Sequence, residues 1–236
     1  MKNIKYKIIQ KYILGVIKGY SNSFILVGET GVGKTELVLR TLKEANLREN
    51  EHFLYLTNYS TPLQMFKILQ KVNELESPKL LILDDYEFSL KNLQFIGLLR
   101  SALWKGVNGQ RKVCWYSTSP KVKDKEFIFE GRIILILNHF DQKNPILRAL
   151  ADRGYFFEIS LNNREKIDLM RERAKKPYQN LSFKQRMAIV NFIEKIGLSS
   201  ENLSLRVLEK AFRLFKLSPH HWQTLLIKSL NHGSKV

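Results

Sequence analysis

Apolar runs separated by longer amphipathic stretches occupy the first 160 residues of the chain. Each run is short, rich in Ile, Leu, Val or Phe, and bounded by polar or turn-forming residues, which is typical of buried strands. We therefore predict strands at 24–27, 51–57, 79–85, 132–138 and 155–160, and helices at 34–45, 61–75, 89–104 and 145–151. Strands that alternate with helices favour an α/β fold, here with a five-stranded parallel sheet.

The pattern changes after residue 160, where apolar residues recur at helical spacing and strand patterns stop. Helices are predicted at 163–175, 182–196, 204–216 and 219–230, and a basic helix at 1–20 opens the chain. Ser182 and Ser204 stand where N-caps of two of these helices are expected. The sequence thus predicts a sheet domain at 1–160 and a helical domain at 161–236.

The first predicted strand runs directly into a glycine-rich turn and then a helix. The turn reads Gly28-Glu29-Thr30-Gly31-Val32-Gly33-Lys34-Thr35. This spacing in this context is that of a phosphate-binding loop, whose backbone N–H groups and helix N-terminus approach phosphate oxygens. Lys34 can reach the β- and γ-phosphates, and the Thr35 hydroxyl is a ligand for Mg²⁺. The motif predicts a nucleoside triphosphate with Mg²⁺.

Two acids end the strand predicted at 79–85. Asp84 and Asp85 follow a fully apolar run, so we expect them at the carboxyl edge of the sheet, where α/β proteins bind ligands. Asp84 is predicted to hold Mg²⁺ together with Thr35, directly or through water. Asp85 is predicted to position or deprotonate the attacking water. The alternative is an acidic turn after a core strand.

Composition narrows the class of protein. The chain carries 39 Lys and Arg against 22 Asp and Glu, a net charge of +17, which favours a polyanionic partner such as nucleic acid over a compositional bias alone. Cys114 is the single cysteine, so neither a disulfide framework nor a cysteine metal cluster is expected. No apolar run approaches the ~20 residues that span a bilayer. These features predict a cytoplasmic protein without membrane contact.

The order of these features resembles the AAA+ ATPases over about residues 12–230. The resemblance implies that the nucleotide is ATP, that 1–160 is the AAA+ core, and that 161–236 is its helical lid. Asn138 ends the strand at 132–138 and is similar to the sensor 1 residue, whose carboxamide holds the attacking water. Arg206 resembles the sensor 2 arginine, which reaches from the lid to the phosphates.

The same resemblance implies an oligomer. The segment 144–154 is similar to the one that carries the family's arginine finger, with Arg153 favoured and Arg148 as the competitor. A finger that acts on a neighbour's nucleotide predicts a homo-oligomer, a hexameric ring or spiral, with a nearly inactive lone subunit. Most of the family has Glu at the position of Asp85, whereas the related superfamily 3 helicases also accept Asp there. The shorter side chain leaves open a slow ATPase or a nucleotide switch.

A basic and aromatic insertion at about 105–130 is expected to form an extended hairpin. It places phosphate-binding charge beside aromatic rings on which bases can stack. The predicted nucleic-acid contacts are Lys105, Arg111, Lys112, Lys121, Lys123 and Lys125. The alternative is that Trp115 and Phe127 are core residues of the hairpin and that the lysines are simply solvated.

The favoured function is an ATP-hydrolysing motor or loader on nucleic acid, above all DNA, in replication, recombination or mobile-element maintenance. A helicase or another replication or mobile-element protein is the candidate protein partner. The alternative is a remodeller or ATP-dependent switch acting on a protein, which requires an exposed aromatic residue such as Tyr59 or Tyr86. DNA, RNA and protein all remain open as the substrate.

Overall fold

The computed structural model describes residues 3–106, 108–116, 125–199 and 202–230. These residues divide into two compact units. The sheet unit holds residues 4–29 and 34–159, and the helical unit holds Asn3, residues 30–33 and the described residues from 160 onward. Each unit has a hydrophobic core of its own.

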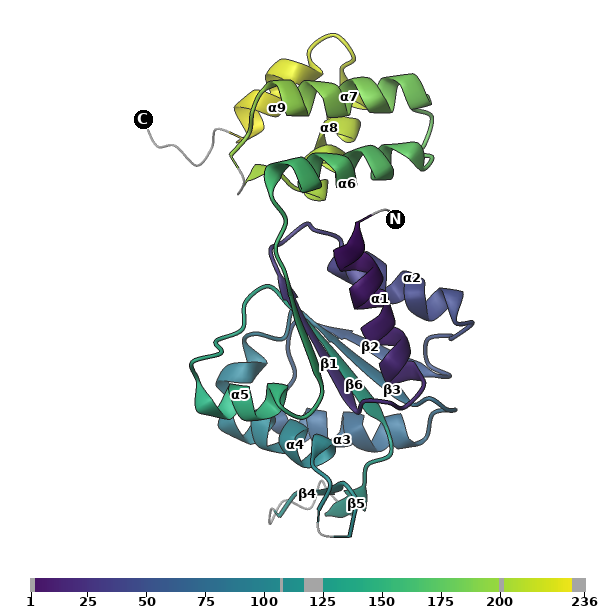
Figure 1. Ribbon diagram of the computed structural model, residues 1–236, viewed down its shortest axis with the longest axis vertical. Helices are drawn as coiled ribbons and strands as arrows, with labels where there is room; N and C mark the ends of the chain where they lie inside the picture. Colours follow the sequence, from purple (N-terminus) through teal and green to yellow (C-terminus); the bar gives the residue numbers. More distant parts are fainter. Residues whose placement is uncertain (1–2, 107, 117–124, 200–201, 231–236) are drawn as a thin grey trace. The chain divides into compact units, whose positions relative to one another are not determined.

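The sheet unit is built on parallel strands in the order β2-β3-β6-β1-β7 (Figure 1). These strands are β1 (Ser23–Gly28), β2 (Phe53–Thr57), β3 (Leu80–Asp84), β6 (Arg132–Leu137) and β7 (Tyr155–Ile159). A separate antiparallel pair is formed by β4 (Lys112–Cys114) and β5 (Glu126–Ile128). The predicted five-stranded parallel sheet is confirmed.

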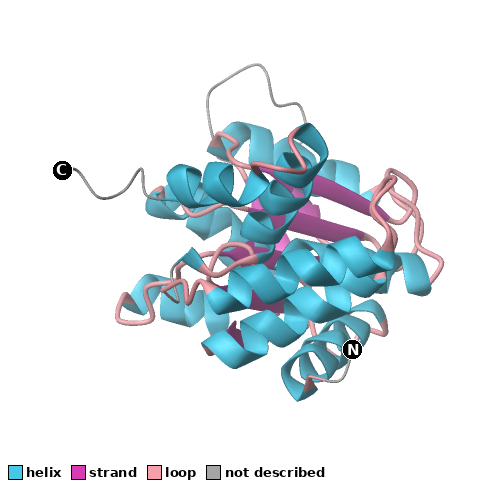
Figure 2. Ribbon diagram, turned by 90° about the horizontal axis from the view of Figure 1, so that it is seen from above, coloured by secondary structure: helices cyan, strands magenta, loops and turns pink. Residues whose placement is uncertain are grey.

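Helices cover both faces of this sheet. They are α1 (Ile4–Ile17), α2 (Lys34–Glu44), α3 (Pro62–Asn73), the 3₁₀ turn η1 (Ser89–Lys91), α4 (Leu93–Leu103) and α5 (Pro145–Ala151). Figure 1 shows α1 and α2 on one face and α3, α4 and α5 on the other, and Figure 2 shows the strands running between helices. Because both faces are covered, every residue of β1 and β3 is buried, which explains their apolar runs at 24–27 and 80–83.

The main core lies between the sheet and the α3, α4 and α5 layer. Ile25 and Val27 of β1 pack there with Phe66 and Leu69 of α3 and Leu99 of α4. Alternate residues of each strand face this layer because successive side chains of a strand point to opposite faces. This packing fixes the positions of the strand ends, where the polar residues of interest lie.

The helix predicted at 89–104 is interrupted. The Asn92 side chain accepts hydrogen bonds from the amides of Gln94 and Phe95, at 2.9 and 3.1 Å, and so caps a new helix after one 3₁₀ turn. Leu93 consequently lies in the first turn of α4, where 66% of its surface is exposed. The prediction of one continuous helix is wrong because Asn is a better N-cap than a helix-interior residue.

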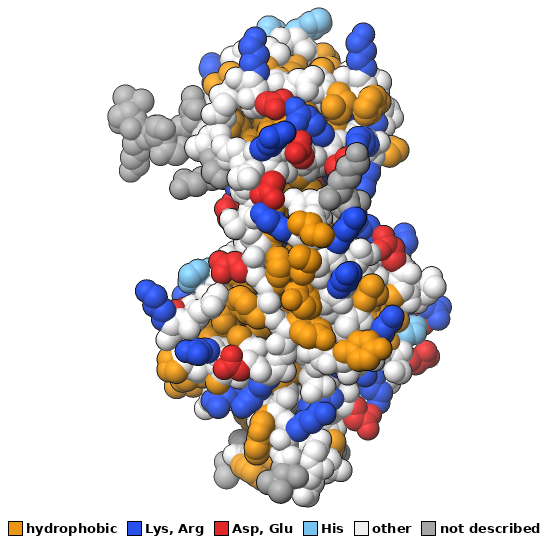
Figure 3. All heavy atoms as spheres, in the orientation of Figure 1, with side chains coloured by type: hydrophobic (Ala, Val, Ile, Leu, Met, Phe, Trp, Pro, Cys, Tyr) orange, Lys and Arg blue, Asp and Glu red, His pale blue; other side chains and the backbone are white. Residues whose placement is uncertain are grey.

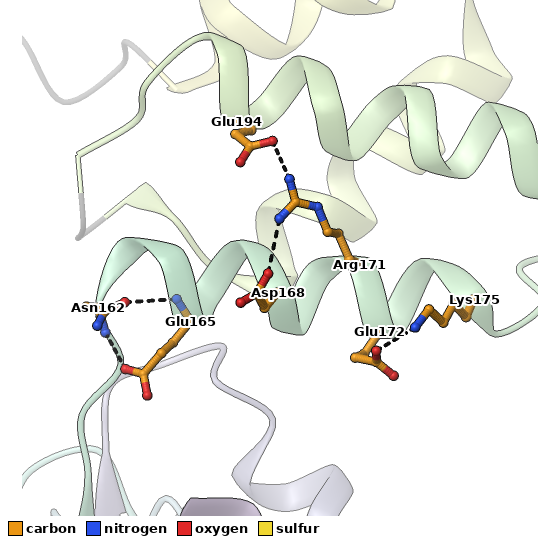
Figure 4. Close-up of polar contacts among 7 residues, drawn as sticks. All are labelled: Asn162, Glu165, Asp168, Arg171, Glu172, Lys175 and Glu194. Atoms are coloured by element: carbon orange, nitrogen blue, oxygen red, sulfur yellow. Dashed lines mark hydrogen bonds and ion pairs between the residues drawn. The ribbon is translucent and has the colours of Figure 1, made fainter. Parts of the chain in front are cut away.

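The helical unit contains α6 (Asn163–Lys175), α7 (Phe183–Lys195), α8 (Leu205–Leu217) and α9 (Trp222–Leu230). The predicted N-caps are confirmed, since the Ser182 and Ser204 side chains both accept hydrogen bonds from amides in the first turns of α7 and α8. Helix α6 opens with a capping box in which Asn162 and Glu165 each bind the other's backbone amide (Figure 4).

Ion pairs add to the contact between α6 and α7. The Arg171 guanidinium lies 3.1 Å from the Asp168 carboxylate on its own helix and 2.6 Å from Glu194 on α7 (Figure 4). Because all three side chains are partly exposed to water, each pair is worth at most about 1 kcal/mol. The main stabilisation comes from fully buried apolar residues such as Ile189 and Leu208.

Positive side chains are distributed over the surface. On the face drawn in Figure 3, Lys and Arg occur in many separate places with acidic side chains among them. The excess positive charge is therefore diffuse on this face. Its distribution alone does not indicate a binding surface, so the local contacts of individual residues have to be considered. None of the helices in the described parts of the chain is long and apolar enough to cross a membrane.

Gly154→Ala is expected to lower the free energy of unfolding by about 1–3 kcal/mol. A Cβ atom at this position would lie 2.1 Å from Ser23 Oγ and 2.4 Å from the Ser23 carbonyl oxygen, so β7 would have to move away from β1. Urea unfolding measures the loss. Gly97→Ala is the control, because its Cβ meets no atom within 4 Å and alanine favours the helix by about 0.5–1 kcal/mol. Equal effects of the two changes would contradict the close approach.

Candidate nucleotide-binding site

The carboxyl ends of three neighbouring strands bring the predicted polar residues together. Lys34 and Thr35 begin the helix that follows β1, Asp84 ends β3, and Asn138 follows β6. Since β6 lies between β3 and β1 in the sheet, Asn138 stands between the phosphate loop and the two acids. Parallel strands place all these ends at one edge of the sheet.

Lys34 is held by oxygen atoms from two directions. Its ammonium group donates hydrogen bonds to the carbonyl oxygens of Gly28, at 2.6 Å, and Glu29, at 3.0 Å, and to Asn138 Oδ1, at 3.1 Å. The side chain is 7% exposed. These acceptors compensate for the water that a buried ammonium group loses.

The Asp84 carboxylate accepts two hydroxyl hydrogen bonds on one oxygen. Thr35 Oγ1 lies 2.7 Å and Tyr55 Oη 2.8 Å from Asp84 Oδ2. Asp84 is 5% exposed. Burial, followed by the hydrogen bond to Asp84, raises the pKa of Tyr55 above its usual range, so the phenol retains the proton that it donates.

Asp85 is held in an uncommon backbone conformation. Its φ angle of 57° lies in the left-handed region, which Asp tolerates better than most residues and which recurs at functional sites. Asp85 is exposed, and its Oδ1 accepts a hydrogen bond from Asn138 Nδ2 at 2.8 Å. The Asn138 backbone amide donates to the Glu87 carboxylate. Asn138 thus bridges Lys34 and Asp85 with the two ends of its carboxamide.

These residues suit a nucleotide with Mg²⁺. The Thr35 hydroxyl and the Asp84 carboxylate are oxygen donors 2.7 Å apart, and Mg²⁺ prefers such ligands, commonly with few from the protein. Gly31 and Gly33 have φ angles of 78° and 80°, which let the loop backbone turn its amides toward an anion. Lys34 adds the positive charge that phosphates require.

Arg206 lies in the helical unit, in the first turn of α8, and is exposed. Within this unit, the Leu205 amide donates a hydrogen bond to the Gly31 carbonyl at 2.9 Å. No hydrogen bond or ion pair of the Arg206 guanidinium is found among the described residues. Its assignment to the phosphates remains a prediction.

The two candidate finger arginines differ in their surroundings. Arg148 lies on α5, is exposed, and borders a hollow of about 440 Å³. Arg153 follows α5 and is half-buried, and its Nε and Nη1 have no hydrogen-bond partner in the described part of the chain. Burial, and then the positive charge of Arg100, lowers the pKa of Arg153. Neither arginine joins the group around Lys34.

The β4–β5 pair is anchored by aromatic packing. The rings of Trp115 and Phe127 lie 6.0 and 5.3 Å from the ring of Phe66 on α3, and both are half-buried. These two residues belong to the packing of the pair, as the alternative interpretation of the sequence has it. Trp104 and Tyr116 are the aromatic residues here that remain open to solvent, at 57% and 79% exposure.

The basic residues predicted to bind nucleic acid fall into different groups. Arg111 is half-buried; its Nη1 donates to the carbonyls of Ala102, at 3.3 Å, and Gly131, at 2.6 Å, and burial lowers its pKa to about 10. A phosphate contact does not fit that arrangement, because the guanidinium supports the base of the β4–β5 pair. The other residues are Lys105 and Lys125, which are exposed, Lys112, which pairs with Glu126 at 2.8 Å, and Lys121 and Lys123, which lie outside the described residues.

The two tyrosines considered for a protein-contacting loop also separate. Tyr86 is 2% exposed and stacks on Phe95, so its prediction as an exposed aromatic residue is wrong. Its ring fills the core beneath α4 because the turn after β3 points it inward. Tyr59 is 50% exposed and forms an edge-to-face pair with Phe88, which is 67% exposed.

Two residues of the site, and one beside Arg153, were not predicted. Tyr55 binds Asp84, Glu87 binds the Asn138 amide, and Arg100 lies near Arg153. A tyrosine in a predicted buried strand is a usable signal, because a buried phenol needs a hydrogen-bond partner. The other two contacts depend on how elements distant in sequence pack, and no local pattern indicates them.

A further cluster of polar side chains lies before β2. Glu51, His52 and Glu76 have ligand atoms within 4.8 Å of one another. His52 Nδ1 already accepts the Arg48 amide at 3.3 Å, and the Arg48 guanidinium lies 2.6 Å from Glu51. These contacts describe an ion-paired turn at the start of an edge strand.

Comparisons with known proteins define the class of fold. No protein-family model matches the chain. Over 177 residues, 70% of the chain, it is 26% identical to a protein of Enterobacteria phage T4 described as an uncharacterized 36.7 kDa protein in the nrdC-mobD intergenic region. The chain spans about half, 53%, of that protein's length.

Solved structures give the wider likeness. A mutant of RuvB from Thermotoga maritima matches 98% of this chain and 70% of its own at a TM-score of 0.61 and 14% identity. The structure of the Thermotoga maritima RuvB Holliday junction branch migration motor matches 96% of this chain and 68% of its own, with a TM-score of 0.57 and 15% identity. The structure of a DNA replication initiation factor matches 92% of this chain and 62% of its own, with a TM-score of 0.56 and 19% identity.

At these identities the likeness shows the fold. The chain has the AAA+ fold, with a five-stranded parallel sheet, a glycine-rich turn after β1 and a helical C-terminal region. The resemblance noted in the sequence is confirmed at this level.

Proposed function

We propose that this chain is a Mg²⁺-dependent ATPase that works as an oligomer on DNA. The observation that carries the proposal is the hydrogen-bonded group at the ends of β1, β3 and β6. In this group Asn138 joins Lys34 to Asp85, and Thr35 meets Asp84. Cation, metal ligands, carboxylate and carboxamide therefore converge in the arrangement that phosphoryl transfer requires.

Each residue has a role that its surroundings support. Lys34 would bind the β- and γ-phosphates, and the metal supplies positive charge at the reacting phosphoryl group. Asp84 is buried and suited to hold the metal, whereas Asp85 is exposed, as a residue that orients water has to be. Asn138 would orient the same water with Asp85, because its carboxamide already contacts that carboxylate.

The oligomer rests on the arginines outside this group. Within the described residues, Nε and Nη1 of the Arg153 guanidinium have no hydrogen-bond acceptor, and Arg100 contributes further positive charge nearby. A half-buried guanidinium with unsatisfied N–H groups is costly, and an anion from another molecule that reaches its exposed part would offset that cost. We therefore favour Arg153 over Arg148 as the arginine that completes a neighbour's site, in a ring or spiral.

DNA as the partner is supported by charge and by likeness. The net charge is +17. Exposed Lys105 and Lys125 belong to the same insertion as exposed Tyr116, and exposed Trp104 directly precedes it. Cationic side chains with exposed rings suit a flexible strand whose bases can stack. The RuvB structure is that of a Holliday junction motor, and the other neighbour is a DNA replication initiation factor.

The test measures ATP hydrolysis by the full chain alone, with single-stranded DNA and with duplex DNA. We expect stimulation by DNA and binding that weakens as salt is raised. Absence of ATP hydrolysis under every condition would overturn the proposed ATPase activity. Hydrolysis that does not change when DNA is added would overturn the proposal that DNA is the partner.

Lys105→Glu combined with Lys125→Glu is expected to weaken DNA binding about tenfold or more and to lower the salt slope by about 2. Fluorescence anisotropy with labelled single-stranded DNA at several salt concentrations measures both. The matched control is Lys7→Glu with Lys11→Glu, which makes the same charge change on exposed positions of α1. Equal loss in both double variants would show that overall charge, and no local surface, governs binding.

A second function, the remodelling of a protein partner, is favoured by one observation. Tyr59 and Phe88 form an exposed aromatic pair on the loops that follow β2 and β3, and Lys91 Nζ lies 5.8 Å from the Phe88 ring. Exposed aromatic residues of this kind commonly contact other proteins. ATP hydrolysis stimulated by a protein and unaffected by DNA would favour this function over the first.

A further inference from the structure

Asp84 depends on its neighbours for its orientation. The terminal torsion of an aspartate is broad, so the strand backbone alone does not fix the plane of the carboxylate. Here Thr35 and Tyr55 both donate hydrogen bonds to Oδ2, at 2.7 and 2.8 Å. Among the described residues, no hydrogen-bond donor is found for Oδ1. The two hydroxyls therefore determine which oxygen of the carboxylate remains for another partner.

Tyr55 reaches Asp84 because of the strand register. In the parallel pair of β2 and β3, Asp84 lies opposite Thr57, two positions beyond Tyr55. Side chains two residues apart share a face of the sheet, and the two positions are separated by roughly 6.6 Å along the strand. The phenol spans this distance and ends in a hydrogen-bond donor, whereas phenylalanine would leave the carboxylate oxygen without this contact.

The arrangement leaves Thr35 available for a cation. Its hydroxyl hydrogen is directed to Asp84, so the lone pairs of Oγ1 are left to bind a metal. Tyr55 donates to the same Asp84 oxygen and so keeps the carboxylate in place as the acceptor for Thr35. Residues that orient metal ligands in this way affect metal affinity without touching the metal.

We propose that Tyr55 is a positioning residue for Mg²⁺, acting through the hydrogen bond from its hydroxyl to Asp84 Oδ2. The proposal rests on the proposed nucleotide-binding function. It assigns to β2, which carries no part of the phosphate loop and neither strand-end acid, a role in metal binding. Its consequence is that the Mg²⁺ dependence of nucleotide binding changes when the hydroxyl is removed.

The test is Tyr55→Phe, which removes one oxygen and keeps the ring. A fluorescent ADP analogue is titrated into the full chain at a series of Mg²⁺ concentrations and in EDTA. We expect the Mg²⁺ concentration for half-maximal binding to rise about tenfold, with binding in EDTA unchanged. The matched control is Tyr116→Phe, which removes a similar hydrogen bond, from Tyr116 to Glu126 at 3.0 Å, far along the chain from the phosphate loop.

A second measurement separates positioning from packing. If Tyr55 acts through Asp84, adding Tyr55→Phe to Asp84→Asn should cause no further shift in the Mg²⁺ requirement. The proposal is overturned if Tyr55→Phe matches Tyr116→Phe in its Mg²⁺ titration, or if its shift persists in full beside Asp84→Asn. Failure of the native chain to bind the analogue at any Mg²⁺ concentration would instead overturn the proposed nucleotide site itself.

Discussion

Lys34→Ala is expected to raise the dissociation constant for ATP about 100-fold or more. The ammonium group would make charge-assisted hydrogen bonds to phosphate oxygens, each worth about 1.5–3 kcal/mol, and tenfold in affinity corresponds to about 1.4 kcal/mol. Two such bonds account for the expected loss. Isothermal titration calorimetry with ATP and Mg²⁺ measures it directly on the full chain.

The variant has to be separated from a folding defect. Lys34 also donates to the Gly28 and Glu29 carbonyls, so its removal leaves acceptors unpaired and lowers stability. Asp85→Asn is the comparison, because Asp85 is exposed and its removal should spare binding while reducing hydrolysis about 10²–10⁴-fold. A Lys34→Ala protein that is folded by circular dichroism and binds ATP normally would contradict the assigned site.

Arg153→Ala is expected to reduce ATP hydrolysis about 10³-fold or more and to leave ATP affinity nearly unchanged. An arginine supplied by a neighbour stabilises charge in the transition state and contributes little to binding in its own subunit. Steady-state hydrolysis and calorimetry measure the two effects separately. Arg148→Ala, in the same segment, should have a much smaller effect on the rate.

Mixing variants tests whether the arginine acts between subunits. Lys34→Ala subunits keep Arg153 but lack the lysine proposed to bind phosphate, and Arg153→Ala subunits have the opposite defect. An equimolar mixture should recover hydrolysis that neither variant has alone. A protein that stays monomeric with ATP and DNA at full activity, or a mixture that shows no recovery, would rule out the trans arrangement.

The sheet and most helices could be predicted because each kind of burial leaves its own hydrophobic pattern in the sequence. A strand buried on both faces gives an apolar run, and a helix buried on one face gives apolar residues at helical spacing. The convergence of Lys34, Asp84 and Asn138 was also predictable, since each follows or ends a parallel strand and such ends meet at one edge. Local chemistry set these features. The N-caps at Ser182 and Ser204 belong to the same class.

Features that depend on contacts distant in sequence were not predictable. Arg111 resembled an exposed phosphate ligand, yet the chain brings the Ala102 and Gly131 carbonyls to it and half-buries it against Phe129. Tyr86 follows two acids in a turn, and only the packing of α4 shows that it faces inward. Charge and aromatic character were readable from the sequence, whereas exposure depended on packing.

The hydrogen bonds around Lys34 have a consequence for the energetics of ligand binding. Three oxygens surround the ammonium, so a phosphate that binds it replaces existing acceptors and forms few additional contacts. The net gain in free energy is then the difference between two sets of hydrogen bonds, and it favours the phosphate because hydrogen bonds between two charged groups are stronger than those to neutral oxygens. If Asn138 is the acceptor displaced, its contact with Asp85 is freed to change as well, and occupancy of the lysine is communicated to the carboxylate through a single side chain.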